Sequence, residues 1–461
     1  MTTKWFVGSK SALIYGGLAL IAACSSTGEG GQGGGSAGSS SGTAGTSSEA
    51  GSGGISTSGG SASAAGTNTV GASGSATAGQ SGGGAGGSSG GNGGGAGSAG
   101  GGQAGTAGMG GAPSGLSYNG AIFYVTRADG TLFAFQTGTW EQVGKWTGLP
   151  ITDGIRGIDA DPATGNIYFT HGGAGPNSFG NVTKNGSLAA WNLYTSKLVY
   201  DKKLEHGVDQ PSYGNALIYV PAGEFTDVRD WIYYRASDGA KLGTEPGGMN
   251  PHDTIYKNGH RYYGGTEDTY LYVIGLPNVT KVGPSPSGTA GVRPFTVNGS
   301  ETRAYITWSN YRGFSVGDLT TGKIIKSVSF GGDPCHIAPS HGMTLSPDNK
   351  EVYVLDTCIN QVKAYTATDD PQLIAAIPFE HDIRPGDENP CAWDCAKDGW
   401  LMHSRDGKYV YVGDSGDIID TATHKITHYM PELANCRHGF LEMVWKDGYI
   451  VDTSTHVGLG Y

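Results

Sequence analysis

Two similar stretches decide the fold: Leu345-Ser-Pro-Asp-Asn-Lys-Glu-Val-Tyr-Val-Leu-Asp356 and His403-Ser-Arg-Asp-Gly-Lys-Tyr-Val-Tyr-Val-Gly-Asp414. Each pairs a turn rich in Pro, Asp, Asn or Gly with a short strand of β-branched and aromatic residues. The strand core recurs along the chain at intervals of 40 to 58 residues, at 122–125, 167–170, 217–220, 260–263, 303–306, 351–354, 409–412 and 449–451. A unit of short strands repeated at this period is typical of a β-propeller blade.

Further strands follow most of these cores, as at 131–135, 187–191, 361–365 and 417–420, and a fourth follows at 323–329. No stretch shows a helical period, so α/β folds are excluded and the fold class is all-β. The predicted domain has seven or eight four-stranded blades. If 439–445 completes the first blade, the count is seven and 447–461 is an appendage. If the N-terminal segment closes the last blade, the count is eight, which we slightly favour.

The two quoted stretches resemble the repeat of the YVTN-type propellers, a family of bacterial extracytoplasmic proteins. The other copies match this repeat more loosely. The resemblance implies a propeller over 116–461 and names no activity, because propellers carry both binding modules and many classes of enzyme.

The segment before the repeats has a different composition. The chain has 83 glycines in 461 residues, and from 25 to 115 it is almost wholly Gly, Ser, Ala and Thr, with Glu29 and Glu49 as its only charges. Such a segment buries too little apolar area to offset the entropy of ordering it. We therefore expect three parts: a signal peptide at 1–23, Cys24 with a disordered linker at 24–115, and the propeller at 116–461.

The first residues indicate export. An apolar run at 12–23 follows Lys4 and Lys10 and ends in Ile21-Ala-Ala-Cys24. The run is too short to span a bilayer and suits a secretory signal. Its end is similar to the lipobox of bacterial lipoprotein precursors, which implies a lipid on Cys24 that anchors the protein in a membrane. Ser25 rather than Asp after the cysteine favours the outer membrane, so we expect a protein of the bacterial cell envelope.

A ring of basic residues is predicted around one mouth of the propeller. The first strand of each blade faces the axis, so positions at a fixed offset before the second-strand tyrosine should form a ring. Twelve residues before that position lie Arg156, Arg293, His341 and His438, and ten residues before it lie His252 and Asp209. The seventh copy has Gly399 at this position, so five of the seven aligned positions are Arg or His.

Three interpretations of this ring stay open. His252, His341 and His438 are candidate ligands of a Cu, Fe or Zn ion. Arg156 and Arg293, with His341 and Asp253, are candidate ligands for a small anionic molecule. In the third interpretation these side chains only satisfy blade carbonyls. A net charge of −11 without a Lys/Arg cluster excludes nucleic acid as a partner.

We favour a module that binds a ligand or a protein partner, because no complete catalytic constellation is evident. The alternative is a metal-dependent enzyme, an oxidoreductase. Five cysteines follow Cys24, at 335, 358, 391, 395 and 436, and all should lie near the ringed mouth. Export predicts two disulfides and one free thiol, with the pairing open; Cys436 is a candidate thiolate ligand. A long loop at 378–391 offers His381, Asp382 and Asp387 to the same mouth.

Overall fold

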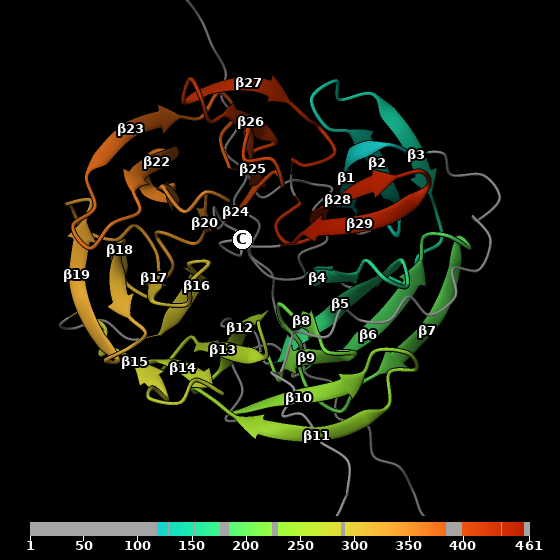
Figure 1. The fold of residues 1–461 in the computed structure, drawn as a ribbon, viewed down its shortest axis with the longest axis horizontal. Coiled ribbons are helices and arrows are strands. Elements are labelled where there is room, and N and C mark those ends of the chain that lie inside the picture. The colour runs from blue at the N-terminus through green and yellow to red at the C-terminus, as the bar shows by residue number, and fades with distance from the viewer. Residues whose placement is uncertain are drawn as a thin grey trace, which may run out of the picture. The chain divides into compact units, whose positions relative to one another are not determined.

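A computed structural model describes residues 118–127, 129–151, 154–175, 184–223, 229–286, 291–383, 399–434 and 436–455. These residues form a β-propeller of seven blades around a central axis (Figure 1). The prediction of an all-β propeller is confirmed. The expected signal peptide, Cys24 and the linker 24–115 lie outside the described residues. Within those ranges, no helix has the length and apolar character needed to cross a membrane.

Each blade is an antiparallel sheet whose strands run outward from the axis in chain order. Blade 1 is closed by strands from both ends of the domain and is described last. Blades 2 to 4 comprise β4 (Ile155–Asp161), β5 (Asn166–Gly175), β6 (Lys184–Asn192) and β7 (Lys197–Lys203); β8 (Ser212–Gly214), β9 (Leu217–Pro221), β10 (Asp230–Arg235) and β11 (Lys241–Pro246); and β12 (Pro251–Lys257), β13 (His260–Gly265), β14 (Leu271–Ile274) and β15 (Lys281–Val282).

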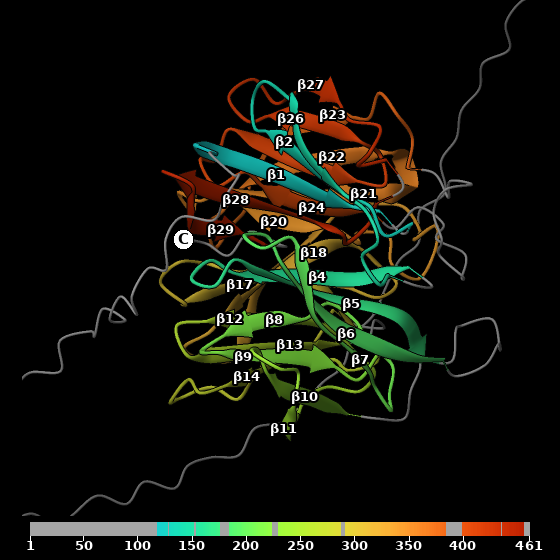
Figure 2. The ribbon, with the colours of Figure 1, turned by 90° about the vertical axis from the view of Figure 1, so that its right-hand side faces the viewer.

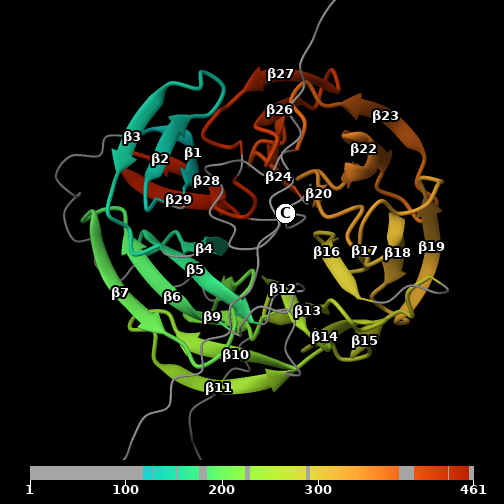
Figure 3. The same ribbon diagram turned by 180° about the vertical axis from the view of Figure 1, so that it is seen from behind.

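Blades 5 to 7 follow the same pattern and are seen from behind in Figure 3. They comprise β16 (Val292–Val297), β17 (Arg303–Trp308), β18 (Tyr311–Asp318) and β19 (Lys323–Ser329); β20 (Met343–Leu345), β21 (Glu351–Asp356), β22 (Gln361–Thr366) and β23 (Leu373–Pro378); and β24 (Trp400–His403), β25 (Tyr409–Gly413), β26 (Asp417–Asp420) and β27 (Lys425–Tyr429). A 3-10 turn, η1 (Thr357–Ile359), follows β21.

The core lies between the blades. Second strands such as β17 and β21 are almost wholly buried, whereas the outer strand β19 is largely exposed. Aromatic rings join neighbouring sheets: the ring centroids of Phe123 and Tyr411 are 3.9 Å apart, and those of Trp231 and Tyr263 are 4.5 Å apart. Large aromatic side chains therefore bury apolar surface between neighbouring blades.

Blade 1 holds the ring of blades closed. Here β28 (Phe440–Lys446) takes the place that the first strand has in the other blades. It pairs with β1 (Gly120–Thr126) from the start of the domain, and β2 (Leu132–Gln136) and β3 (Gln142–Trp146) follow outward. The preference for eight blades is therefore wrong, and the alternative of seven is right. The core at 449–451 misled the count because it lies in an extra strand, β29 (Tyr449–Ser454), on the side of β28 opposite β1 (Figure 2).

Strand β29 is tied to the two blades that flank blade 1. The backbone N–H of Ile450 donates to the Tyr194 hydroxyl of blade 2 at 2.9 Å. In blade 7, Arg405 forms an ion pair with Asp452 at 2.7 Å, and Ser454 Oγ donates to the His403 carbonyl at 2.9 Å. Because His403 is the last residue of β24, these contacts lie toward the end of the innermost strands.

Candidate functional site

The predicted ring lies where the innermost strands begin. Arg156, His252 and Arg293 are the second residues of β4, β12 and β16. His341 and His438 stand two residues before β20 and β28. All five side chains are buried, with 1% to 4% of their surface exposed. The alignment on the second-strand tyrosine therefore placed these residues correctly.

Three histidines from different blades meet at this end of the axis. The Nε2 atoms of His252 and His341 are 3.2 Å apart, and their ring centroids are 5.3 Å apart. The centroid of His438 is 5.9 Å from that of His341. Trp400, the first residue of β24, packs among them, with its ring 4.3 Å from His438 and 5.4 Å from His341.

Backbone carbonyls orient two of the imidazoles. His438 Nδ1 lies 3.0 Å from the carbonyl oxygen of Arg156, and His341 Nδ1 lies 3.2 Å from that of Gly399. A carbonyl only accepts, so each Nδ1 carries the proton and donates it. Within the described residues, His438 Nε2 and the Trp400 indole N–H have no hydrogen-bond partner although both are buried.

Three buried arginines surround these rings. Arg156 pairs with Asp209 at 2.6 Å, Arg437 pairs with Asp414 at 3.4 Å, and Arg293 Nε donates to Ser309 Oγ at 2.9 Å. We call the set His252, His341, His438, Trp400, Arg156, Arg293 and Arg437 the axial cluster. Sequence reasoning missed Trp400 and Arg437, although each directly follows or precedes an aligned ring position.

The cluster holds two of its histidines, His252 and His438, neutral. Burial, then the neighbouring His341 and the three arginines, lowers the pKa of His252 well below its ordinary value. Burial, then Arg437 and Arg156, does the same to His438. These shifts have a common cause, since a buried imidazolium beside guanidinium groups is both poorly solvated and repelled.

Asp253 directly follows His252 in the sequence, but its carboxyl group is held between two blades. It accepts the backbone N–H of Thr254 at 2.8 Å and that of Phe295 on β16, so it lies between blades 4 and 5. Burial raises its pKa well above the ordinary range, so its surroundings favour the neutral carboxyl.

As the side chains stand, the described residues contain no group of three or more His, Cys, Asp or Glu arranged to hold a metal ion. Neutral imidazoles are nevertheless suitable metal ligands, and the three histidines are close together. A metal site in this cluster would therefore depend on the distances from His341 to His252 and to His438.

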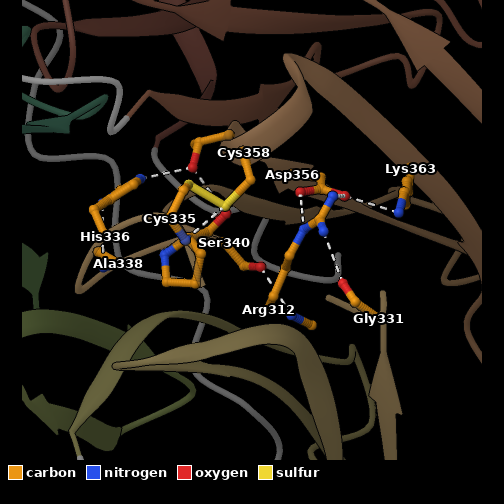
Figure 4. Close-up of a disulfide and its surroundings, with 12 residues drawn as sticks. Arg312, Gly331, Cys335, His336, Ala338, Ser340, Asp356, Cys358 and Lys363 are labelled. Carbon is orange, nitrogen blue, oxygen red and sulfur yellow. Dashed lines mark hydrogen bonds and ion pairs between the residues drawn. A yellow bond between two sulfur atoms is a disulfide. The ribbon is translucent and has the colours of Figure 1, made fainter. Parts of the chain in front are cut away.

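The cysteines are partly as expected. Cys335 and Cys358 form a disulfide (Figure 4), and Cys436 is a free, buried thiol. Cys391 and Cys395 lie outside the described residues. Burial raises the pKa of Cys436 to about 12, and its Sγ donates to the Thr126 carbonyl. A protonated thiol is a poor metal ligand, so this cysteine does not support the thiolate interpretation.

The disulfide joins the segment that leads to His341 with the turn after β21. Beside it, Asp356 receives Arg312 through two nitrogens at 2.7 and 3.0 Å and Lys363 at 2.8 Å (Figure 4). His336 contacts the Thr357 hydroxyl at 2.8 Å. Arg312 also donates to the Gly331 carbonyl at 2.7 Å, so the loop 330–340 is held near both of its ends.

The long loop does not bring its first charged residues to the cluster. His381 stacks on Tyr429 with ring centroids 3.7 Å apart and pairs with Asp417 at 2.7 Å. Asp382 accepts the amide of Asn360 at 3.0 Å. Both therefore lie over outer strands of blades 6 and 7. Asp387 lies outside the described residues.

A surface pocket of about 510 Å³ lies between blades 1 and 7. Its lining residues are Arg127, Asp129, Phe133, Pro431 and Glu432. None of these belongs to the axial cluster. Its charges have both signs, so it does not share the basic character of the cluster.

Comparison with known proteins supports the fold. No protein-family model matches the chain, and no curated protein matches it. Among solved structures, a functionally unknown protein from Desulfotomaculum acetoxidans DSM 771 has a TM-score of 0.52 at 12% identity, covering 70% of this chain and 98% of that chain. A Bacteroides fragilis NCTC 9343 protein, provisionally described as a 6-phosphogluconolactonase, has a TM-score of 0.50 at 13% identity, covering 68% and 94%. At these identities the likeness concerns the propeller alone.

Proposed function

We propose that this protein is a lipid-anchored propeller of the bacterial cell envelope that binds a small anionic molecule at the axial cluster. The cluster brings guanidinium groups and the Trp400 indole N–H from several blades to one end of the axis. Guanidinium groups bind carboxylates and phosphates through two hydrogen bonds at once. A protein partner would need to present such an anion to the same end.

The positive potential of the cluster carries this proposal. Arg156, Arg293 and Arg437 all act on His252 and disfavour its charged form. Arg156 and Arg437 are paired with Asp209 and Asp414, so the three arginines less these two carboxylates leave a local net charge of +1, whereas the whole chain has −11. A buried region of one sign attracts ligands of the other, and the surrounding low dielectric strengthens the attraction.

The cell-envelope location rests on the sequence. Ile21-Ala-Ala-Cys24 at the end of an apolar run supports lipidation of Cys24, and the following Gly/Ser segment suits a tether. The YVTN-like repeats agree with an extracytoplasmic protein. On this proposal the propeller would be held near the membrane and remain free to rotate, which suits the capture of small molecules.

A thermal-shift screen tests the ligand class. Inorganic phosphate, sulfate, acetate and citrate are compared with glucose as a neutral control, each at several concentrations. A ligand that binds only the folded state raises the melting temperature, and the shift grows with concentration. At least one anion should give a shift that saturates at constant ionic strength. Equal shifts for all solutes, glucose included, would reject an anion site.

A metal-dependent enzyme is the second candidate. The observation in its favour is the 3.2 Å contact between His252 Nε2 and His341 Nε2. An oxidoreductase of this kind would contain metal as purified without a histidine tag, and removing the metal would abolish a redox activity. Metal analysis of the untagged protein, followed by cyclic voltammetry, separates this candidate from a simple binding module.

A further inference from the structure

We infer that the axial cluster binds one divalent metal ion, Zn²⁺ or Cu²⁺, through Nε2 of His252, His341 and His438, and that the anion is the fourth ligand of this ion. The histidine site stands on the geometry of the three rings. The role of the anion rests on the proposed function.

The tautomers are the first reason. His341 and His438 each donate Nδ1–H to a backbone carbonyl, at 3.2 and 3.0 Å. In a neutral ring this leaves the lone pair on Nε2. Histidines that bind metals commonly donate their other ring N–H to a carbonyl or carboxylate, which fixes the ring and its basic nitrogen. Both rings are therefore already set for coordination through Nε2.

The distances are the second reason. Two nitrogens bound to one tetrahedral ion at the usual bond length lie about 3.3 to 3.4 Å apart. The Nε2 atoms of His252 and His341 are 3.2 Å apart. The ring centroids of two such ligands should lie about 5.2 Å apart. The observed separations are 5.3 Å for His252 and His341 and 5.9 Å for His341 and His438. His252 and His341 therefore already stand at coordination spacing, and His341 and His438 are within about 1 Å of it; binding requires His438 to move toward His341.

The orphaned buried groups are the third reason. His438 Nε2 and the Trp400 indole N–H lack a hydrogen-bond partner among the described residues, and their side chains are 4% and 1% exposed. Buried polar atoms are rarely left without a partner. A metal ion would satisfy the nitrogen lone pair, and an anion on that ion would accept the indole N–H.

Charge explains why the two ligands should bind together. Neutral imidazoles leave the ion with its full charge, and Arg156, Arg293 and Arg437 already make the potential at His252 positive. A cation entering such a place requires an anion beside it. A fourth position occupied by a carboxylate or phosphate oxygen provides this anion and completes a tetrahedron with three histidines. Metal and anion should therefore raise each other's affinity.

Metal counting tests the histidine site. The untagged full chain is stripped with chelator, equilibrated with Zn²⁺ or Cu²⁺, desalted and analysed by mass spectrometry for metal. One ion per chain is expected for the wild type and for His381→Ala, a more exposed control histidine. His341→Ala and His438→Ala should each lose the ion, with metal-free melting curves showing that they are folded. Absence of metal from the wild type, or full retention in both folded variants, would overturn the inference.

Calorimetry with inorganic phosphate tests the fourth ligand. The Zn²⁺-loaded protein should bind phosphate at least about fivefold more tightly than the stripped protein, a typical coupling between linked ligands. Equal anion affinity with and without metal overturns the coordination role and leaves the proposed function standing. Metal binding with no anion binding in either form overturns the proposed function and the fourth-ligand role, while the histidine site stands.

Discussion

Asp159 shows at the scale of one residue how the propeller buries charge. It lies on β4, 5% exposed, and accepts backbone N–H groups of Tyr213 at 2.6 Å and Ala160 at 2.7 Å. Burial outweighs these hydrogen bonds and raises its pKa from 3.8 to about 6. The folded protein therefore holds this proton more tightly than the unfolded chain does.

The pH dependence of stability follows from this shift. Asp159 contributes most below its unfolded pKa, and the contribution is lost as pH rises through its folded pKa of about 6. The loss should be about 2 kcal/mol between pH 4 and pH 7.5. Urea unfolding of the wild type and Asp159→Asn across this range measures it, since the variant should remove this component of the slope. Parallel curves for the two proteins would show that Asp159 does not titrate in this way.

Residue alignment predicted most of the axial cluster and missed its centre. The offset from the second-strand tyrosine is fixed by blade geometry, so it located three histidines and two arginines. In the seventh copy the aligned position is Gly399, with φ +62°, where a Cβ would approach Leu355 and Ile383 to 2.8 and 2.9 Å. The left-handed backbone and these contacts favour glycine there, and Trp400, the next residue, supplies the side chain. The spacing of residues along the chain does not show which side chain packs at such a position.

At the scale of elements, β28 and β29 have different roles. β28 takes the place of the first strand in blade 1 and pairs with β1 over six residues. β29 adds an ion pair and hydrogen bonds to blades 2 and 7. The ring of blades needs the first strand and should survive loss of the second.

Two truncations test this difference. A chain ending after Lys446 should still unfold cooperatively, with a stability loss of a few kcal/mol because single hydrogen bonds and one half-buried ion pair contribute about 1 kcal/mol each. A chain ending after Arg437 loses β28 and leaves buried β1 without its partner, so it should show no cooperative transition. Thermal unfolding followed by circular dichroism distinguishes them. A cooperative fold in the shorter chain would contradict closure through β28.

The Cys335–Cys358 disulfide is the second element that can be tested. It spans a sequence separation of 23 residues and holds the segment before His341 against η1. Closing a loop of this length should stabilise the fold by about 3 kcal/mol. The double variant Cys335→Ser, Cys358→Ser should lose this amount in urea unfolding, and a reducing agent should not weaken it further. A loss below about 1 kcal/mol would show that the surrounding hydrogen bonds hold the loop without the disulfide.

At the scale of the whole molecule, the sequence period was enough to predict a β-propeller but not the number of its blades. Seven of the eight strand cores are second strands, and the fourth strand predicted at 323–329 coincides with β19. The eighth core, at 449–451, has the same apolar character because β29 is also packed against a blade. Sequence similarity reports that a strand is half-buried in a sheet and carries no information about which side of its neighbour it occupies.

The proposed anchoring also belongs to this scale. Replacing Cys24 removes the thiol that would carry the lipid, so Cys24→Ser should move the protein from the membrane fraction to the soluble fraction. Ser25→Ala is the matched control and should stay with the membranes. Fractionation of cells expressing each form, followed by immunoblotting, gives the result. Membrane retention of Cys24→Ser would rule out the lipid as the anchor.

The central claim is that the basic end of the axis binds a small anion, and calorimetric titration of the best anion into three proteins tests it most directly. Arg293→Gln removes a guanidinium from the axial cluster, whereas Arg405→Gln removes one beside Asp452 on β29. Loss of a charged hydrogen-bond donor predicts binding about 10- to 100-fold weaker in Arg293→Gln. Arg405→Gln should bind like the wild type. Equal affinity of Arg293→Gln and wild type, with both folded, would contradict the account.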